Sequence, residues 1–298
     1  MQPIHFSPGS LIALNSCLAF IMFGVALEMK PEHFTQLLNQ KKAILTGLFS
    51  QIILLPFITF LLVLILPISK GMALGMILVA ACPGGNVSNF FSMLAKGNVA
   101  LSVTLTAFSS LLAFIITPIN FFFWASLAPN MATEVKEFNI DILSLTVNMA
   151  LILLLPLVVG MWMAKQFPSL TLKIGKAIRL LSILILAAFI VIAFFNNKNA
   201  FTSNFINVFL VVLLHNGLAL LLSYFFSMSL KNDEATNRTV AIETGIQNSG
   251  LGLILIFTFF NGNPEMALVA AWWGIWHLIS GFGFSLLMRG RTFQSIAK

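Results

Sequence analysis

Apolar stretches of about twenty residues or more recur from end to end of this 298-residue chain, separated by short polar joints. A helix needs about 20 apolar residues to cross a hydrocarbon layer roughly 30 Å thick, so this pattern is typical of an all-α integral membrane protein. The composition agrees, because 59% of the residues are hydrophobic and only 8% are charged. A soluble domain does not need such a ratio to fill its core.

We predict about nine transmembrane helices in a single transmembrane unit, residues 1–298. They cover approximately residues 9–29, 42–66, 71–95, 98–127, 140–164, 176–195, 204–229, 236–260 and 264–288. The first apolar stretch has no basic leader before it and no small-residue cleavage site after it, so we expect it to remain as a span.

Lys and Arg residues gather in alternate joints between these spans. With nine spans, 13 of the 16 basic residues fall on one side, and only Lys70, Lys136 and Lys198 fall on the other. Cytoplasmic loops carry the basic excess, so we predict a multi-pass protein with its N-terminus outside and its C-terminus in the cytoplasm. The basic residues form no patch interleaved with aromatic residues, and we expect the lipid bilayer, not nucleic acid, as a partner.

Two spans carry polar, glycine-containing sequences near their middle. Residues 82–89 read CPGGNVSN, and residues 243–250 read ETGIQNSG. Pro and Gly interrupt helices, and backbone freed inside a membrane survives only where protein or a polar cavity satisfies it. We therefore expect each break to line a cavity. Glycine hinges or close-packing sites are the alternative interpretation.

The order of the spans makes the two broken ones antiparallel. Spans one to four and spans six to nine form two groups of opposite topology. In each group the third span is the broken helix, and span five belongs to neither group. Carriers with inverted repeats are built in this way, and their binding site lies where the discontinuous helices meet near the midplane. The predicted fold class is therefore an all-α inverted-repeat transporter with two crossed discontinuous helices.

Glu243 stands deep inside a span, five residues past Arg238. An intramembrane carboxylate is costly, which makes it a candidate functional residue. Oxygen ligands that suit a hard cation are predicted at similar depth, namely Gln51 and, four residues apart on one helical face, Ser102 and Thr106. A structural salt bridge or a protonated carboxylate is the alternative for Glu243, and Ser and Thr in membrane helices usually bond to their own backbone.

An organic anion needs different partners. A half-helix that starts after Gly85 or Gly245 offers N–H groups and the positive end of its dipole, which suit a carboxylate. Asn86, Asn248 and His277 can add neutral hydrogen bonds, although His277 can equally be a satisfied interior histidine. No nucleophile motif, metal-ligand pair or cofactor loop accompanies the histidines, so we expect no cofactor and no enzyme.

Three segments, residues 83–89 (PGGNVSN), 96–106 (KGNVALSVTLT) and 242–251 (IETGIQNSGL), resemble the signature regions of the bile acid:sodium symporter family, including its bacterial members. The resemblance extends over nearly the whole chain. It implies one sodium site, which comprises Ser88, Asn89, Ser102, Thr106 and Glu243. It implies a second, which comprises Gln51, Glu243 and Gln247 with the backbone carbonyls of Thr244 and Ile246.

The same resemblance implies a core of crossing broken helices, about residues 42–127 and 204–288, that moves against a panel, about residues 9–29 and 140–195. The implied function is sodium-coupled symport of an organic anion by alternating access, in a bacterial plasma membrane. The anion would be bile acid-like or a small carboxylate such as pantoate, and we expect a monomer. A cation:proton antiporter of related fold is the alternative, but such proteins usually contain further buried acidic residues.

Two features depart from the family pattern. Well-studied bacterial members have an additional N-terminal helix, so this chain is expected to begin at their second helix, which leaves both implied sodium sites intact. Leu278 stands after His277 where relatives often have Asn, which leaves their mode of substrate contact open here.

Overall fold

The structure is a computed structural model that describes residues 16–17, 19–24, 26–27, 40–129, 131, 142–196 and 198–290. The named elements in these residues are all helices, which confirms the all-α prediction. Of the predicted first span, about residues 9–29, the structure describes residues 16–17, 19–24 and 26–27.

The helices follow the predicted spans closely, with two short π-helical segments among them. In chain order the elements are α3 (Lys41–Phe49), η2 (Ser50–Leu54), α4 (Leu55–Ile65), α5 (Lys70–Ala81), α6 (Val87–Leu94), α7 (Val99–Leu127), α9 (Ile142–Met149), η3 (Ala150–Leu154), α10 (Leu155–Gln166), α11 (Pro168–Asn196), α12 (Lys198–Ser229), α13 (Glu234–Gly245), α14 (Ser249–Phe259) and α15 (Pro264–Gly290).

Five helices in the described part of the chain are long and apolar enough to cross a membrane. They are Lys41–Ile65, Val99–Leu127, Thr146–Gln166, Ile206–Ser229 and Pro264–Gly290, and α5 and α14 are shorter apolar helices. The chain is therefore a multi-pass membrane protein. The count of nine spans and their inverted repeat stay predictions.

The long helices present apolar side chains outward and polar side chains inward. On the first of them the exposed residues recur every fourth position, as Leu45, Phe49, Ile53, Phe57 and Leu61, and on α7 as Ile115, Ile119, Phe123 and Leu127. Residues four apart share a helical face, so each helix has one continuous apolar surface. Buried hydroxyl and amide groups lie inside, as is usual for polar residues in a membrane bundle.

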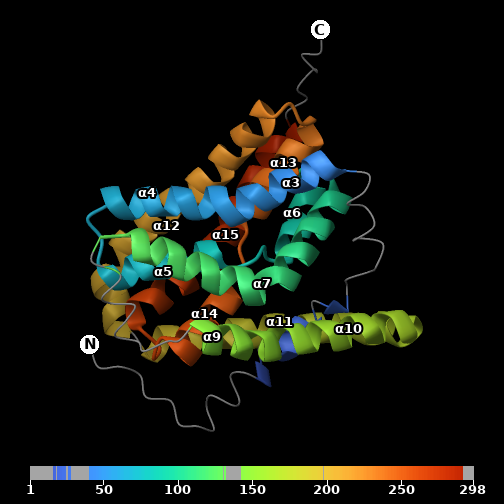
Figure 1. Cartoon of the computed structure of the whole chain (residues 1–298), viewed down its shortest axis with the longest axis horizontal. Helices are drawn as coiled ribbons and strands as arrows, with labels where there is room; N and C mark the ends of the chain where they lie inside the picture. Colours follow the sequence, from blue (N-terminus) through green and yellow to red (C-terminus); the bar gives the residue numbers. More distant parts are fainter. Residues whose placement is uncertain are drawn as a thin grey trace.

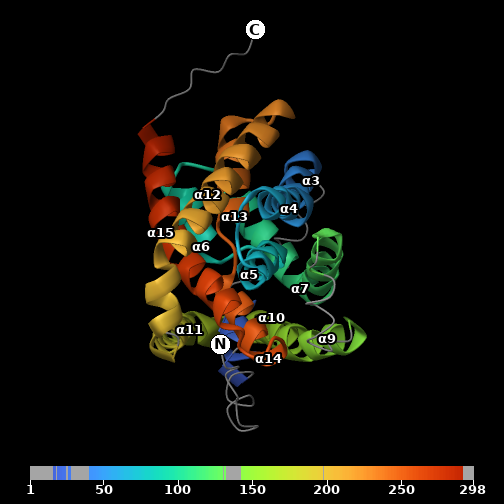
Figure 2. The same cartoon turned by 90° about the vertical axis from the view of Figure 1, so that its left-hand side faces the viewer.

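The helices form two groups in space. Figure 1 shows α9, α10 and α11 lying together along one side of the molecule, and the quarter turn in Figure 2 keeps them there. The remaining helices stack beside them, with α5 packed on α15 and α12 on α13. Residues of α14 and η3 line a shared pocket, so α14 reaches the α9–α11 group.

Both predicted helix interruptions are present. Cys82 takes an extended conformation (φ −69°, ψ 157°), because the residue before a proline is disfavoured in the helical region. Residues 82–86 therefore connect α5 to α6. The second connector consists of residues 246–248, between α13 and α14.

The two connectors pair with each other. Gly84 and Gln247 form an antiparallel bridge, Gly85 N donates to Ile246 O (2.8 Å) and Asn248 N donates to Pro83 O (2.8 Å). The backbone groups released by one broken helix are thus satisfied by the other, which meets the requirement for irregular backbone inside a membrane. The pairing brings the ends of four half-helices to one place.

The π-helical segment η2 was not predicted. It directly precedes Leu55 and Pro56, and proline has no N–H to offer the carbonyl four residues earlier. That carbonyl, on Ile52, accepts a hydrogen bond from Asn120 Nδ2 of α7 instead (2.9 Å). A widened turn of this kind often marks a functional position, and here it contains Gln51.

Candidate functional site

The Glu243 carboxylate is fully buried near the end of α13, at the meeting point of the connectors. The hydroxyls of Ser88 and Ser102 donate hydrogen bonds to its Oε1, and Thr106 Oγ1 lies 3.0 Å from its Oε2. Gln51 Nε2 donates to Oε2 (3.2 Å) and to the backbone oxygen of Glu243 (3.0 Å). We call these five residues the Glu243 cluster.

Four elements supply the cluster. Ser88 lies in the first turn of α6, directly after the first connector, and Ser102 and Thr106 lie one turn apart on α7. The predicted shared face of Ser102 and Thr106 is confirmed, since both hydroxyls reach the same carboxylate. Asn89 joins through its Oδ1, which lies 2.9 Å from Ser102 Oγ.

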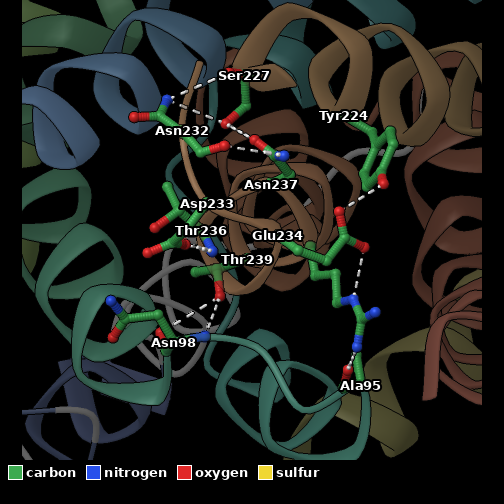
Figure 3. A network of polar contacts seen from close by, with 11 residues as sticks. Ala95, Asn98, Tyr224, Ser227, Asn232, Asp233, Glu234, Thr236, Asn237 and Thr239 are labelled. Carbon is green, nitrogen blue, oxygen red and sulfur yellow. Dashed lines mark hydrogen bonds and ion pairs between the residues drawn. The ribbon is translucent and has the colours of Figure 1, made fainter. Parts of the chain in front are cut away.

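Glu243 makes no ion pair within the described residues. Arg238, five residues earlier, pairs with Glu234 (2.8 Å) and donates to Ala95 O (2.9 Å). Figure 3 labels both of these partners, Glu234 and Ala95. The described residues therefore show no structural salt bridge at Glu243, and the alternative of a protonated carboxylate stays a prediction. A buried carboxylate surrounded only by neutral donors is a place where a cation is strongly stabilised, because burying a single charge is costly.

Two buried amide oxygens lack a hydrogen-bond partner in the described structure: Oε1 of Gln51, within the cluster, and Oε1 of Gln247, which lies in the second connector. The amide nitrogens are engaged, because Gln247 Nε2 donates to Thr244 O (2.9 Å) and Gln51 Nε2 donates to Glu243. Buried polar atoms without a partner are rare. Together with carboxylate, hydroxyl and carbonyl oxygens, they form a donor set that fits a hard monovalent cation.

The carbonyls assigned by resemblance have partners in this arrangement. Thr244 O accepts from Gln247 Nε2, and Ile246 O accepts from Gly85 N (2.8 Å). A carbonyl oxygen has two lone pairs, so each keeps one for a cation. The Thr244 hydroxyl is used elsewhere and donates to Ser50 Oγ (2.8 Å).

The residues predicted to bind an anion differ in whether their polar groups are already hydrogen-bonded and in how exposed they are. The Gly85 and Asn248 amides are paired across the connectors, and the Asn248 side chain accepts from Leu251 N (3.0 Å) as the N-cap of α14. Asn86 precedes α6 without a side-chain cap bond and is partly exposed. His277 is buried in α15. Of the four, the Asn86 side chain is the best placed to meet a ligand.

Asn216 is a site residue to which sequence reasoning assigned no role. It is buried in α12, its Nδ2 donates to Gly245 O (2.7 Å), and its Oδ1 accepts from Ser280 Oγ of α15 (2.5 Å). The last carbonyls of a helix lack partners within that helix, so Asn216 supplies the missing donor to a carbonyl at the end of α13. Its polar side chain inside a span was the available signal.

Comparison with known proteins agrees with the resemblance of the motifs. The profile described as the Sodium Bile acid symporter family matches residues 15–204. The chain belongs to the sodium bile acid symporter family. This confirms the family that the three signature segments indicated, and it places the chain among sodium-dependent transporters.

Relatives of this family member occur in bacteria, plants and animals. The chain is 32% identical over 268 residues to YocS of Bacillus subtilis, an uncharacterized sodium-dependent transporter. The aligned region covers 89% of this chain and 79% of that protein. It is 31% identical over 264 residues to the probable sodium/metabolite cotransporter BASS1 of Arabidopsis thaliana, covering 89% and 63%. Rat sodium/bile acid cotransporter 5 is 28% identical over 261 residues, covering 86% and 58%. The chain spans about three fifths of the plant and rat proteins.

Proposed function

We propose that this protein couples the inward movement of sodium to the uptake of an organic anion across the plasma membrane of a bacterium. Its family, and relatives that are named as a sodium-dependent transporter and a probable sodium/metabolite cotransporter, support sodium dependence. The observation that carries the proposal is the Glu243 cluster, a buried carboxylate among neutral oxygen ligands where two broken helices meet.

Sodium binds at two positions that share Glu243. The first position takes its ligands from Ser88, Asn89, Ser102, Thr106 and Glu243, and the second from Gln51, Glu243, Gln247 and the carbonyls of Thr244 and Ile246. A hydroxyl that donates its proton to the carboxylate can rotate and offer a lone pair to sodium. The cation thus replaces proton donors as the partner of Glu243.

The anion binds beside the connectors. Asn86 and Asn248 are partly exposed there, at the starts of α6 and α14, where the helix dipoles favour negative charge. His277 is buried in α15, one turn before Gly281, where an added Cβ would lie 2.8 Å from Ile246 Cδ1 of the second connector. The substrate class is a bile acid-like compound or a small carboxylate.

Transport proceeds by alternating access. The helices α3–α7 and α12–α15 form the core, and α9–α11 belong to the panel against which the core rocks. Sodium orders the connectors and neutralises Glu243 before the anion binds. Because coupled binding is reciprocal, sodium raises the affinity for the anion and the anion raises the affinity for sodium by the same factor.

Thermal unfolding of the purified protein tests the cation site. We expect sodium, but not potassium, to raise the melting temperature of the wild type, because a ligand that binds only the folded state stabilises it. The E243Q variant should lose this effect. E265Q is the matched control. Glu265 lies in the first turn of α15, outside the cluster, and accepts a hydrogen bond from Ser69. Equal sodium stabilisation of E243Q and wild type would refute the assignment.

A further inference from the structure

Gln51 lies within the π-helical segment η2, and the direction of its side chain depends on that segment. Leu55 N bonds to Ser50 O, five residues earlier, so the turn contains one residue more than an α-turn. The extra residue rotates Gln51 by about 100° relative to α4. In this position Gln51 Nε2 reaches the Glu243 carboxylate (3.2 Å) and its backbone oxygen (3.0 Å). A regular α-turn would direct the Gln51 side chain away from the Glu243 cluster by about the same angle.

A proline permits the wide turn. Both π-helical segments in the described residues stand directly before a Leu-Pro pair, η2 before Leu55 and Pro56 and η3 before Leu155 and Pro156. Proline has no N–H, and its ring crowds the carbonyl four residues earlier, so a regular α-turn does not close there. In η2 this carbonyl belongs to Ile52. The stability of the wide turn therefore depends on where the Ile52 carbonyl finds a donor.

A side chain of another helix supplies that donor. Asn120 of α7 donates from Nδ2 to the Ile52 carbonyl (2.9 Å). Asn120 is buried, and a buried carbonyl without a donor is costly. Asn120 follows Thr106, a member of the Glu243 cluster, by 14 residues, which is about 21 Å along α7. Asn120 is therefore too far along α7 to be part of the cluster, and it is connected to the cluster through η2.

Contacts from two other helices hold the residues on either side of Gln51. The residue before it, Ser50, is buried, and its Oγ lies 2.8 Å from the Thr244 hydroxyl of α13. The residue after it accepts the hydrogen bond from Asn120. Gln51 Nε2 is bonded to Glu243, and Gln51 Oε1 is buried without a hydrogen-bond partner in the described structure. The packing around η2 thus holds this oxygen in place, and no bond of the oxygen itself does.

We propose that Asn120 is a positioning residue for sodium: by bonding to the Ile52 carbonyl, it holds the π-turn that directs Gln51 Oε1 to the second sodium position. This role rests on the proposed function, because it takes sodium as the cation and Gln51 as its ligand. Asn120 is not a ligand itself, since neither sodium position includes it. Groups that orient metal ligands change metal affinity by roughly 10–100-fold when they are removed.

The test replaces Asn120 by a side chain of similar shape that cannot donate. N120L should raise the sodium concentration at half-maximal thermal stabilisation, the sodium midpoint, about tenfold, because the π-turn can then relax and Gln51 loses its direction. N237A is the matched control. Asn237 is also a buried amide, accepts from Ser227 Oγ (2.7 Å), and lies about 9 Å before Glu243 along α13. N237A should lower the melting temperature in potassium and leave the sodium midpoint unchanged.

A double substitution separates positioning from packing. In a Q51A background the first sodium position keeps all its ligands, so a sodium midpoint can still be measured. N120L should not change the midpoint of Q51A further, because Gln51 is the residue through which Asn120 acts. Such non-additivity is expected of two residues that share one effect. N120A also lacks the donor, and it takes the place of N120L if the larger side chain prevents folding.

Two results would overturn the positioning role of Asn120. One is an unchanged sodium midpoint in N120L, which would leave Asn120 a packing residue whatever the melting temperature. The other is an equal rise of the midpoint with and without Gln51, which would show that Asn120 acts by another route. If sodium fails to stabilise the wild-type protein, the proposed function itself is wrong. Sodium stabilisation of the wild type with either of the two results removes the role of Asn120 alone.

Discussion

Glu243 accepts hydrogen bonds from three hydroxyls and one amide, and a sodium ion would compete with the protons of those groups for the same oxygens. Under the proposed function, each hydroxyl is therefore a cation ligand as well as a hydrogen-bond donor. Their removal has different consequences from removal of the carboxylate, because the charge remains.

T106V should weaken sodium binding about tenfold, which corresponds to the loss of one oxygen ligand worth about 1.4 kcal/mol. The measurement is the sodium concentration at half-maximal thermal stabilisation. T104V is the control, because its hydroxyl bonds to Ala100 O on the other side of α7. The same sodium midpoint for T106V and T104V would exclude Thr106 as a ligand.

G84A should abolish sodium stabilisation, because its Cβ would lie 2.9 Å from Gln51 Nε2 and 3.1 Å from Glu243 Oε2. These two side chains would have to move. G283A on α15 has nothing within 4 Å of the new Cβ and should keep the sodium response. G283A should even gain up to about 1 kcal/mol of stability from the helix propensity of alanine. A normal sodium response in G84A would contradict the described cluster.

At the scale of elements, the broken helices depend on partners outside themselves. Asn216 of α12 completes the end of α13 by donating to Gly245 O, and Ser280 of α15 donates to Asn216. The connectors could not hold Glu243 in place if these ends were free to fray.

N216A should destabilise the protein by about 1–3 kcal/mol, because it leaves the Gly245 carbonyl buried without its donor. S280A should destabilise the protein less than N216A, since it leaves the hydrogen bond from Asn216 to the Gly245 carbonyl intact. Thermal unfolding in potassium, without bound sodium, measures both effects. Equal effects of the two substitutions would show that Asn216 does not act through Gly245.

Hydropathy and helix breakers predicted most of the described α-helices, but not how the helices meet. The ends of α4, α7 and α13 and both interruptions fall within a few residues of prediction, because long apolar runs and Pro83 are local signals. The π-helical turn at Gln51 and the hydrogen bonds between connectors depend on packing between distant segments. Glu243 was found because it is a carboxylate in an apolar span, whereas Asn216 resembles many other buried amides.

At the scale of the whole molecule, the distribution of basic residues predicts its orientation. Because 13 of the 16 Lys and Arg residues fall on one side of nine spans, the C-terminus should lie in the cytoplasm. A fluorescent protein fused to the C-terminus should therefore fluoresce, and alkaline phosphatase at the same place should be inactive. An active phosphatase fusion would require an even number of spans or the opposite orientation.

Uptake driven by a sodium gradient tests the central claim most directly. Thermal unfolding with a panel of carboxylates, in sodium and then in potassium, identifies the anion to use, and the radiolabelled anion is then offered to liposomes containing the purified protein. We predict that an inward sodium gradient accumulates the anion through wild type and E265Q, and that E243Q or replacement of sodium by potassium abolishes accumulation. Equal uptake in potassium, or proton flux without any organic anion, would contradict sodium-coupled anion transport.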